Sequence, residues 1–271
     1  MLIAQLSDTH IAVPEDEFSE LYHPAEKLRN AVRHVNGSVN RPDIVFLTGD
    51  LVNSAKAEEY VILKEIVAEF EMPVYLLPGN HDDCTLLRKA FPDHDYLPSS
   101  GTLNYVVDGW PLKLIALDTN IHGKPQGHLG EVQLAWLEEE ISKEAARPVV
   151  ILLHHPPFKT GLTSMDAMGL LDMDDFVDVI SRYDTVERVL CGHLHRAIQK
   201  LAGGTLVQTC PSTSHQVRLL LGDNNELGTA FEPPEYLLHY WTEEGGLVTH
   251  SDYVKEYDVA WTLKDGVKKS D

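Results

Sequence analysis

Aspartate, asparagine and histidine residues recur along the chain in short clusters that follow apolar runs. The clusters are Asp8-Thr9-His10, Gly49-Asp50, Gly79-Asn80-His81-Asp82, His154-His155-Pro156 and Gly192-His193-Leu194-His195. Carboxylate and amide oxygens combined with imidazole nitrogens are ligands that suit Zn²⁺, Fe, Mn²⁺ or Co²⁺ rather than Ca²⁺. Residues two apart on an extended chain point the same way, so the two end members of an Asp-x-His or His-x-His cluster can face one ion. The clusters therefore predict a site for divalent metal ions.

Each cluster also has an ordinary explanation when it is taken alone. Asp50 after a strand is commonly a helix cap, and Asn80-His81 after Pro-Gly suits a turn. His154 alone is more often a hydrogen-bonded core histidine. Asp8-x-His10 is a pattern short enough to arise by chance. Five clusters in consistent positions are hard to explain as separate accidents, which favours the metal site.

The apolar runs in front of the clusters are the elements that must position them, and we expect them to be buried strands. They lie at Leu2–Leu6, Ile44–Leu47, Val74–Leu77, Leu114–Leu117, Val149–Leu153 and Val189–Cys191. Amphipathic helices are expected between them, at Pro24–Asn36, Ala57–Phe70, Asp83–Phe91, Glu131–Ala145 and Asp172–Tyr183. This alternation indicates an α/β layered fold. Parallel strands bring their carboxyl ends to one edge of the sheet, so the clusters should converge on one cleft.

The pattern changes after the last cluster, where strand-like segments replace the helical periodicity. We expect strands at Thr205–Thr209 and His215–Leu221, an exposed loop at Leu221–Pro234, and a hairpin from Tyr236 to Tyr253 that turns at Gly245-Gly246. The polar tail from Lys264 to Asp271 should be frayed. The expected division is a catalytic domain at 1–220 and a C-terminal loop and β-hairpin at 221–271. The hairpin serves as a cap or oligomerisation element, or it simply completes the sheet.

Composition narrows the class of partner and the compartment. The 271 residues include 22 basic and 42 acidic side chains, a formal net charge of −20, which disfavours binding to long nucleic acids. The three cysteines are far apart and form no C-x-x-C pair, which argues against a disulfide framework and favours a reducing compartment. The N-terminus lacks the pattern of a signal peptide, and the longest aliphatic run, Val149–Leu153, is too short to cross a bilayer. We expect a cytoplasmic protein with no membrane partner.

The ordered set of clusters resembles the signature of the calcineurin-like metallophosphoesterase superfamily, over about residues 3 to 200. The resemblance implies a four-layer α/β/β/α sandwich, two mixed sheets flanked by helices, in place of a simple layered domain. It also implies two divalent ions (Fe, Mn, Zn or Co): Asp8, His10 and His195 resemble ligands of one ion, and Asn80, His154 and His193 resemble ligands of the other. Asp50 resembles the bridging carboxylate.

The resemblance also implies a catalytic chemistry. A hydroxide that bridges the two metals would be the nucleophile, because two Lewis acids ionise water near neutral pH. His81 resembles the family's non-ligand histidine, which contacts a phosphoryl oxygen or the leaving group. We expect Asp82 or another carboxylate to orient it.

The residues around the clusters bear on the type of phosphoester. Phosphoprotein phosphatases of the superfamily carry an arginine before Gly-Asn-His and a glutamate after it, where this chain has Pro78 and Asp82. The chain resembles instead the bacterial branch of glycerophosphodiesterases and class III cyclic nucleotide phosphodiesterases, whose members commonly form dimers or higher oligomers. We expect hydrolysis of a small phosphodiester, with His81, Asn80 and His215 near the substrate. A phosphomonoesterase and a non-catalytic metal-binding scaffold are the alternatives, and a structural role for His215 is equally open.

Overall fold

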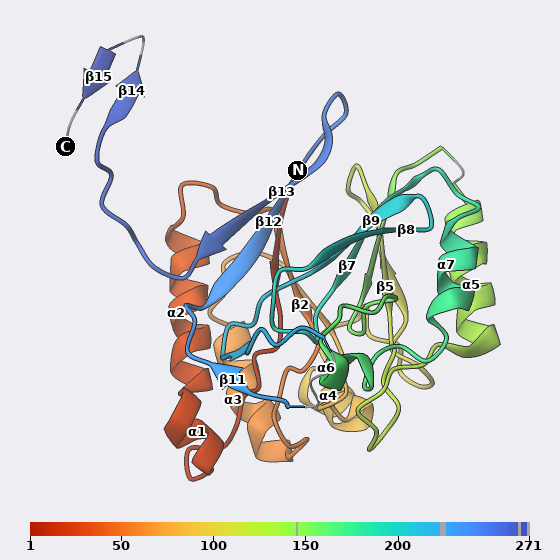
Figure 1. Ribbon diagram of the computed structural model, residues 1–271, viewed down its shortest axis with the longest axis horizontal. Coiled ribbons are helices and arrows are strands. Elements are labelled where there is room, and N and C mark those ends of the chain that lie inside the picture. Colours follow the sequence, from red (N-terminus) through yellow and green to blue (C-terminus); the bar gives the residue numbers. More distant parts are fainter. Residues whose placement is uncertain (145, 223–225, 265–266, 270–271) are drawn as a thin grey trace.

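The computed structural model describes residues 1–144, 146–222, 226–264 and 267–269, and its centre is a pair of β-sheets. The first sheet has the strand order β13-β12-β1-β2-β3 and the second has the order β4-β5-β6-β7-β9-β8. Each sheet mixes parallel and antiparallel pairs. The expected arrangement of two mixed sheets flanked by helices is therefore confirmed (Figure 1).

Parallel pairing joins the expected strands within each of the two sheets. In the first sheet β1 (Leu2–Leu6), β2 (Ile44–Thr48) and β3 (Val74–Leu77) pair in parallel. In the second sheet the parallel strands are β5 (Lys113–Leu117), β6 (Val149–Leu153), β7 (Val186–Cys191) and β9 (Thr205–Thr209). The antiparallel edge strands β4 (Tyr105–Val107) and β8 (Gln199–Ala202) were not expected from the sequence.

Side chains of the second sheet alternate between two apolar clusters, as a sheet buried on both faces requires. Leu114, Ala116 and Leu152 belong to the cluster that includes the first sheet. Ile115 and Ile151, their neighbours along the strands, belong to a separate cluster with helices α5 and α7. The strands consequently read as continuous apolar runs in the sequence.

Helices cover the outer faces of both sheets (Figure 1). On the first sheet lie α2 (Pro24–Gly37) and α3 (Ala57–Val67), and on the second lie α5 (Gly130–Ser142) and α7 (Met173–Ile180). Shorter helices are α1 (Glu17–Tyr22), α4 (Cys84–Ala90) and α6 (Thr163–Asp166). The five expected helices are present with shifted ends, although Ala145, the expected end of one, is outside the described residues. Among the described residues, no helix combines the length and apolar character of a membrane span.

The segment after β9 departs most from expectation. The strand expected at His215–Leu221 is only β10 (Gln216–Val217), which pairs with β11 (Thr229–Ala230) inside the expected loop. The Gln216 side chain bonds back to the backbone of Ser212, just before the strand. Residues 223–225 of the expected loop are outside the described part of the chain.

The C-terminal hairpin completes the first sheet. β12 (Glu235–Thr242) pairs antiparallel with β1, and β13 (Gly246–Tyr253) is the outer strand. Beyond it the chain leaves the body of the molecule and forms β14 (Thr262–Lys264) and β15 (Val267–Lys269), which pair with each other (Figure 1). The residues from Lys264 on were expected to fray; of these, 265–266 and 270–271 lie outside the described residues. The division at residue 220 remains a prediction about which part folds on its own.

Candidate metal centre

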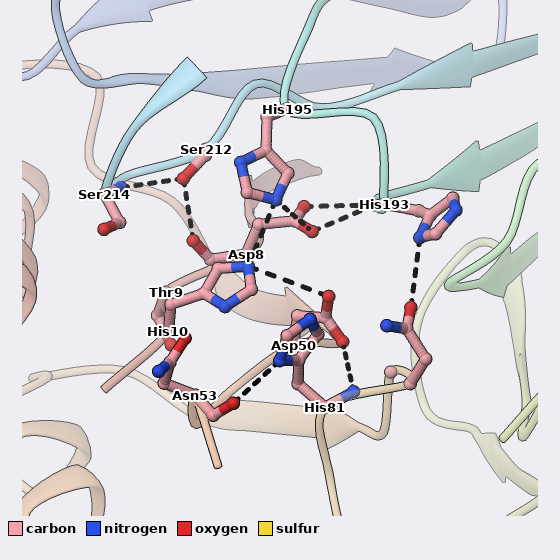
Figure 2. A network of polar contacts seen from close by, with 12 residues as sticks. Asp8, Thr9, His10, Asp50, Asn53, His81, His193, His195, Ser212 and Ser214 are labelled. Atoms are coloured by element: carbon pink, nitrogen blue, oxygen red, sulfur yellow. Dashed lines mark hydrogen bonds and ion pairs between the residues drawn. The ribbon is translucent and has the colours of Figure 1, made fainter. Parts of the chain in front are cut away.

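All five clusters lie at the carboxyl ends of parallel strands. They follow β1, β2 and β3 in the first sheet and β6 and β7 in the second. The side chains that meet there include Asp8, His10, Asp50, His193 and His195 (Figure 2). The predicted convergence on one place is therefore present in the fold.

The backbone at these positions is held in an unusual conformation. Seven non-glycine residues with positive φ occur in the described part of the chain, and five of them are expected ligands: Asp8, His10, Asp50, His193 and His195, with φ of 52°, 45°, 48°, 71° and 49°. A non-glycine residue in the left-handed region costs free energy and persists only where its surroundings fix it. Such a concentration of strained residues is typical of a functional site.

One group of ligand atoms gathers around Asp8, His10 and His195. The Nε2 atoms of His10 and His195 are 3.1 Å apart, and His195 Nε2 is 3.2 Å from Asp8 Oδ1. A metal with ligand bonds of about 2.1 Å holds neighbouring ligand atoms roughly 3.3 Å apart. These separations therefore suit three ligands of one cation.

Asp50 joins this group to a second one. Its Oδ2 atom is 3.7 Å from His10 Nε2, while its Oδ1 atom is 3.4 Å from His154 Nε2. The second group also contains His193, whose Nδ1 atom is 3.1 Å from Asn80 Oδ1. The two oxygens of Asp50 thus face different groups, which is the geometry of a carboxylate shared by two ions.

A buried nitrogen without a hydrogen bond indicates that the second group fits a metal ion. His154 Nε2 is buried and forms no hydrogen bond, and it lies 3.4 Å from Asp50 Oδ1. His154 donates from Nδ1 to the carbonyl oxygen of Thr48 at 2.8 Å, so its Nε2 lone pair faces Asp50. A buried polar nitrogen left unpaired is costly, and a cation would satisfy it. The donor set fits two divalent ions.

His155 lies beside His154 and His193, close enough to count as a third possible ligand. Both of its ring nitrogens are already engaged, Nδ1 with Thr119 Oγ1 at 2.8 Å and Nε2 with the Pro125 carbonyl at 3.2 Å. We therefore assign it to the packing of the site.

The charges of the site attract positive charge to its centre. Burial alone would lower the pKa of His154, but the Asp50 carboxylate outweighs burial and raises this pKa to about 9. Asp8 acts in the same way against burial to raise the pKa of His195. Burial lowers the pKa of His193 to about 3 and holds the pKa of His10 well below its usual value. The carboxylates therefore favour positive charge at His154 and His195, which a bound cation would supply in place of a proton, while burial keeps His193 and His10 neutral as ligation needs.

Two glycines allow the segments of the site to approach one another. At Gly192 a Cβ atom would collide with Ser7 Oγ and the Thr48 carbonyl. Gly49 has φ of +90°, and a Cβ there would enter the His154 ring. Side chains at these positions would push the ligand-bearing turns apart.

His81 stands at the open side of the centre, with its ring centroid 4.7 Å from that of His10. Its backbone N–H donates to Asp50 Oδ1 at 2.9 Å, and its Nδ1 atom donates to the Asn53 carbonyl at 2.7 Å (Figure 2). The orienting group is therefore a backbone carbonyl, and the expectation of a carboxylate such as Asp82 was wrong. The sequence has no local signal for this contact because Asn53 is 28 residues away.

Asp82 instead ties together the two loops that carry Asp50 and His81. Its Oδ2 atom accepts from the backbone N–H groups of Gly79 at 2.8 Å and Leu51 at 3.0 Å. It is 3 % exposed, and burial, with the Asp50 charge, raises its pKa to about 7. Asp82 therefore supports the site without contacting His81.

His215 lies where it was expected, but with a second role. Its backbone carbonyl accepts from His195 Nδ1 at 2.8 Å, which aims His195 Nε2 at Asp8. Its ring centroid is 4.6 Å from that of His195 and 4.5 Å from that of Tyr22. The hydroxyl of Ser212 fixes this loop: it donates to the Asp8 carbonyl at 2.7 Å (Figure 2) and accepts from the His215 N–H at 3.1 Å. The Ser212 contacts were missed by sequence reasoning.

The ligand groups open into a cavity of about 220 Å³. Its lining contains Asp50, Asn80, His81, His10, His193, His195 and His215, together with Phe18, Asn53, Pro125, Met165, Met168, Val217, Leu227 and Thr229. No lysine or arginine is among these described lining residues. A small molecule can therefore reach the candidate centre and His81 together.

Comparisons with known proteins agree with this arrangement. The chain is 36% identical over 259 residues to a probable glycerophosphodiester phosphodiesterase GpdQ of Arcobacter nitrofigilis, with 95% of each protein covered. It is 28% identical to the 3',5'-cyclic adenosine monophosphate phosphodiesterase CpdA of Escherichia coli K12, over 80% of this chain and 77% of that protein. A dimetal phosphatase from Danio rerio shares the fold, with a TM-score of 0.62 and 12% identity over 94% of this chain and 99% of that one. The family model described as calcineurin-like phosphoesterase matches residues 1–197, and the chain belongs to that family.

Proposed function

We propose that the protein hydrolyses a small phosphodiester at a binuclear metal centre. The observation that carries the proposal is the position of Asp50, whose two carboxylate oxygens face two separate groups of ligand atoms at the base of the cavity. Relatives that align over most of this chain are named as glycerophosphodiester or cyclic nucleotide phosphodiesterases, which supports the same reaction class.

The proposed ligands divide between the two ions. Asp8, His10 and His195 would hold one ion, and Asn80, His154 and His193 would hold the other. Asp50 would be shared. Two bound divalent cations would make hydroxide available near neutral pH and would withdraw charge from the phosphodiester.

His81 is the proposed catalytic side chain that does not bind metal. Because a carbonyl oxygen only accepts hydrogen bonds, the Nδ1 atom facing Asn53 carries a proton, and Nε2 is left to face the substrate. In its protonated form Nε2 can donate a hydrogen bond to a phosphoryl oxygen and pass its proton to the departing alkoxide. The Asn53 carbonyl holds the ring in that orientation.

The cavity favours a diester over the alternative, a phosphomonoester. A monoester carries a charge near −2 at neutral pH, whereas a diester carries one negative charge. The cavity lining described above contains no lysine or arginine to balance the second charge. The metal ions and His81 alone would face it.

The test uses matched aryl esters. Wild-type protein with defined Mn²⁺, Fe²⁺ or Zn²⁺ loading should hydrolyse bis(p-nitrophenyl) phosphate faster than p-nitrophenyl phosphate, and Asp50→Ala and Asn80→Ala should lose this activity. Glu131→Gln, an exposed change on α5, is the control and should keep it. A clear preference of the wild type for the monoester would reject the diester proposal. Full activity in metal-stripped Asp50→Ala would reject the binuclear mechanism.

A metal-binding scaffold without catalysis is the remaining alternative. The filled set of candidate ligands and the open cavity beside His81 favour an enzyme. Metal analysis distinguishes the two: about two ions per chain with diester turnover supports the enzyme, and fewer ions with no hydrolysis of any ester supports the scaffold.

We also propose that the chain forms a homo-oligomer in a reducing, cytoplasmic compartment. The three cysteines are unpaired. The C-terminal arm after β13 exposes large apolar side chains, among them Tyr257, Val259 and Leu263 at 59%, 53% and 63%, and a second copy would cover them. Light scattering on the full chain and on a chain ending at residue 254 tests this: an identical mass for both would reject a role for the arm.

A further inference from the structure

The residues that line the cavity beside the candidate centre, apart from the candidate ligands, His81 and His215, are uncharged. We call these residues the wall. The apolar residues of the lining are Phe18, Pro125, Met165, Met168, Val217 and Leu227. Apart from the candidate ligands, His81 and His215, its polar members are Asn53 and Thr229. Thr229 Oγ1 bonds to the Tyr22 hydroxyl at 2.7 Å, and Asn53 Nδ2 bonds to Ser54 Oγ at 3.4 Å. Apart from the candidate ligands, His81 and His215, the lining therefore offers few polar partners to a substrate.

Phe18 is the aromatic member of this wall. It is half-buried on α1, and its ring centroid lies 5.9 Å from that of His10 and 5.4 Å from that of His215. A group attached to a phosphate at the metal centre would thus pass close to the Phe18 ring.

The helix that carries Phe18 is fixed in place by contacts to distant parts of the chain. Asp16 caps it by accepting from the Phe18 N–H at 3.0 Å, and Asp16 in turn accepts from Lys56 Nζ at 3.2 Å. Tyr22, at the other end of α1, stacks on His215 with centroids 4.5 Å apart. The ring is therefore pre-positioned, which lowers the entropy cost of contacting a ligand.

The methionines of the wall are also held by structure. Met165 is 5% exposed and packs in a small cluster with Leu162, Leu194 and Val217. Asp166 anchors the segment by accepting from the N–H groups of Thr160 and Gly161. Methionine side chains adapt to flat ligands and make favourable contacts with aromatic rings.

We propose, building on the phosphodiesterase activity above, that Phe18 is a specificity-determining residue whose ring stacks on a flat heterocycle carried by one alcohol group of the substrate, such as a nucleobase. A glycerol group would present hydroxyls to a wall with few groups to pair with them, and unpaired polar groups cost binding free energy. A nucleobase presents a π-face, which stacks on an aromatic side chain. The wall therefore favours nucleoside phosphodiesters over glycerol phosphodiesters.

The test compares two substrates that differ only in the base. We would measure kcat/KM for 3',5'-cyclic AMP and for the base-free ribose 3',5'-cyclic phosphate in wild type, Phe18→Ala, Phe18→Tyr and Leu21→Ala. Leu21 is on the same helix, is 53% exposed and does not line the cavity, so it is the matched control. Phe18→Ala should lose about 5- to 150-fold on the nucleotide, the range of one base–aromatic stack. Its loss on the base-free ester should stay within about threefold. Phe18→Tyr and Leu21→Ala should resemble wild type on both.

Three results would overturn the proposal. Equal losses on both esters in Phe18→Ala would show that Phe18 only packs against Tyr22 and His215. No loss on the nucleotide would show that the ring does not contact the base. If kcat/KM of the wild type were the same for both esters, there would be no specificity for Phe18 to determine.

A binding experiment separates this inference from the proposed function. Calorimetry on metal-loaded protein measures the dissociation constants of AMP and of ribose 5-phosphate and gives their ratio. Wild type should bind AMP more tightly than ribose 5-phosphate, and Phe18→Ala should bind the two equally. If no phosphodiester is hydrolysed under any metal loading, the proposed reaction fails while this ratio still decides the role of Phe18. If diesters are hydrolysed and the ratio is the same in both proteins, only the Phe18 proposal fails.

Discussion

Replacing Asp82 by asparagine should damage the site without removing any ligand. Asp82 accepts four hydrogen bonds: from Leu51 N at 3.0 Å and Gly79 N at 2.8 Å on Oδ2, and from Val52 N at 3.3 Å and Tyr60 Oη at 3.1 Å on Oδ1. Asparagine turns one of these oxygens into an NH₂ group, so two buried donors lose their acceptor. Each unsatisfied buried donor costs about 1–3 kcal/mol, so the free energy of unfolding should fall by roughly 2–6 kcal/mol.

Activity should fall as well, because the bonded loops carry the proposed ligands Asp50 and Asn80 and the proposed catalytic residue His81. A displacement near 1 Å of a catalytic group costs about 100-fold in rate. We therefore expect kcat for a diester substrate to fall by about two orders of magnitude in Asp82→Asn. The assays are urea denaturation followed by circular dichroism, metal analysis, and turnover of bis(p-nitrophenyl) phosphate.

Asp83→Ala is the matched control for this experiment. Asp83 is the adjacent carboxylate and also accepts backbone N–H groups, from Thr85 and Leu86 at 2.8 Å each, but these bonds cap α4 and do not join the two loops. Its loss should cost about 1 kcal/mol of stability and leave turnover unchanged. The reasoning is refuted if Asp82→Asn unfolds within about 0.5 kcal/mol of wild type and keeps its kcat, or if Asp83→Ala loses activity to the same extent.

Four further outcomes are expected. Chelation should lower the melting temperature of the wild type, since a bound ion stabilises the folded state and His154 Nε2 is buried without a hydrogen bond, and should leave Asp50→Ala almost unshifted; equal shifts would contradict the shared role of Asp50. Ser212→Ala should lower the free energy of unfolding by about 1–3 kcal/mol and weaken metal binding. Thr213→Val removes a buried hydroxyl without a hydrogen bond and should change neither quantity. Gly192→Ala should lower the yield of folded protein and its metal content, because the added Cβ meets Ser7 and Thr48; normal metal content would show that the turn can relax. Burial lowers the pKa of His239 from 6.5 to about 3, so the unfolded state binds more protons and stability falls as the pH drops below 6.5; the share of His239 in the loss at pH 5 is about 2 kcal/mol, and a His239→Gln variant that loses as much as the wild type would contradict it.

Sequence reasoning located the strands and helices that are predicted by the pattern of their own residues. The strands Leu2–Leu6, Val74–Leu77 and Val149–Leu153 have the expected bounds, because strands buried on both faces are continuous apolar runs. Helix α1 was not expected, since its six residues depend on Tyr22 contacts with His215 and Thr229, about 200 residues away. The periodicity of apolar residues is the same whether the strands form one sheet or two. The prediction of two sheets therefore came from the family resemblance.

The ligand positions show where local rules fail for a functional reason. A residue with φ near +50° is ordinarily glycine, asparagine or aspartate, because a Cβ is strained there. Histidine occupies that conformation at His10, His193 and His195. The conformation is imposed by long-range contacts: the backbone N–H of His10 bonds to the Asp50 carbonyl at 2.9 Å, and the N–H of His193 bonds to the Asp8 carboxylate at 3.1 Å. No propensity of the single residue predicts it. The conflict between local preference and fold marks these positions as a functional site, and histidine offers there a nitrogen for the proposed metal ions.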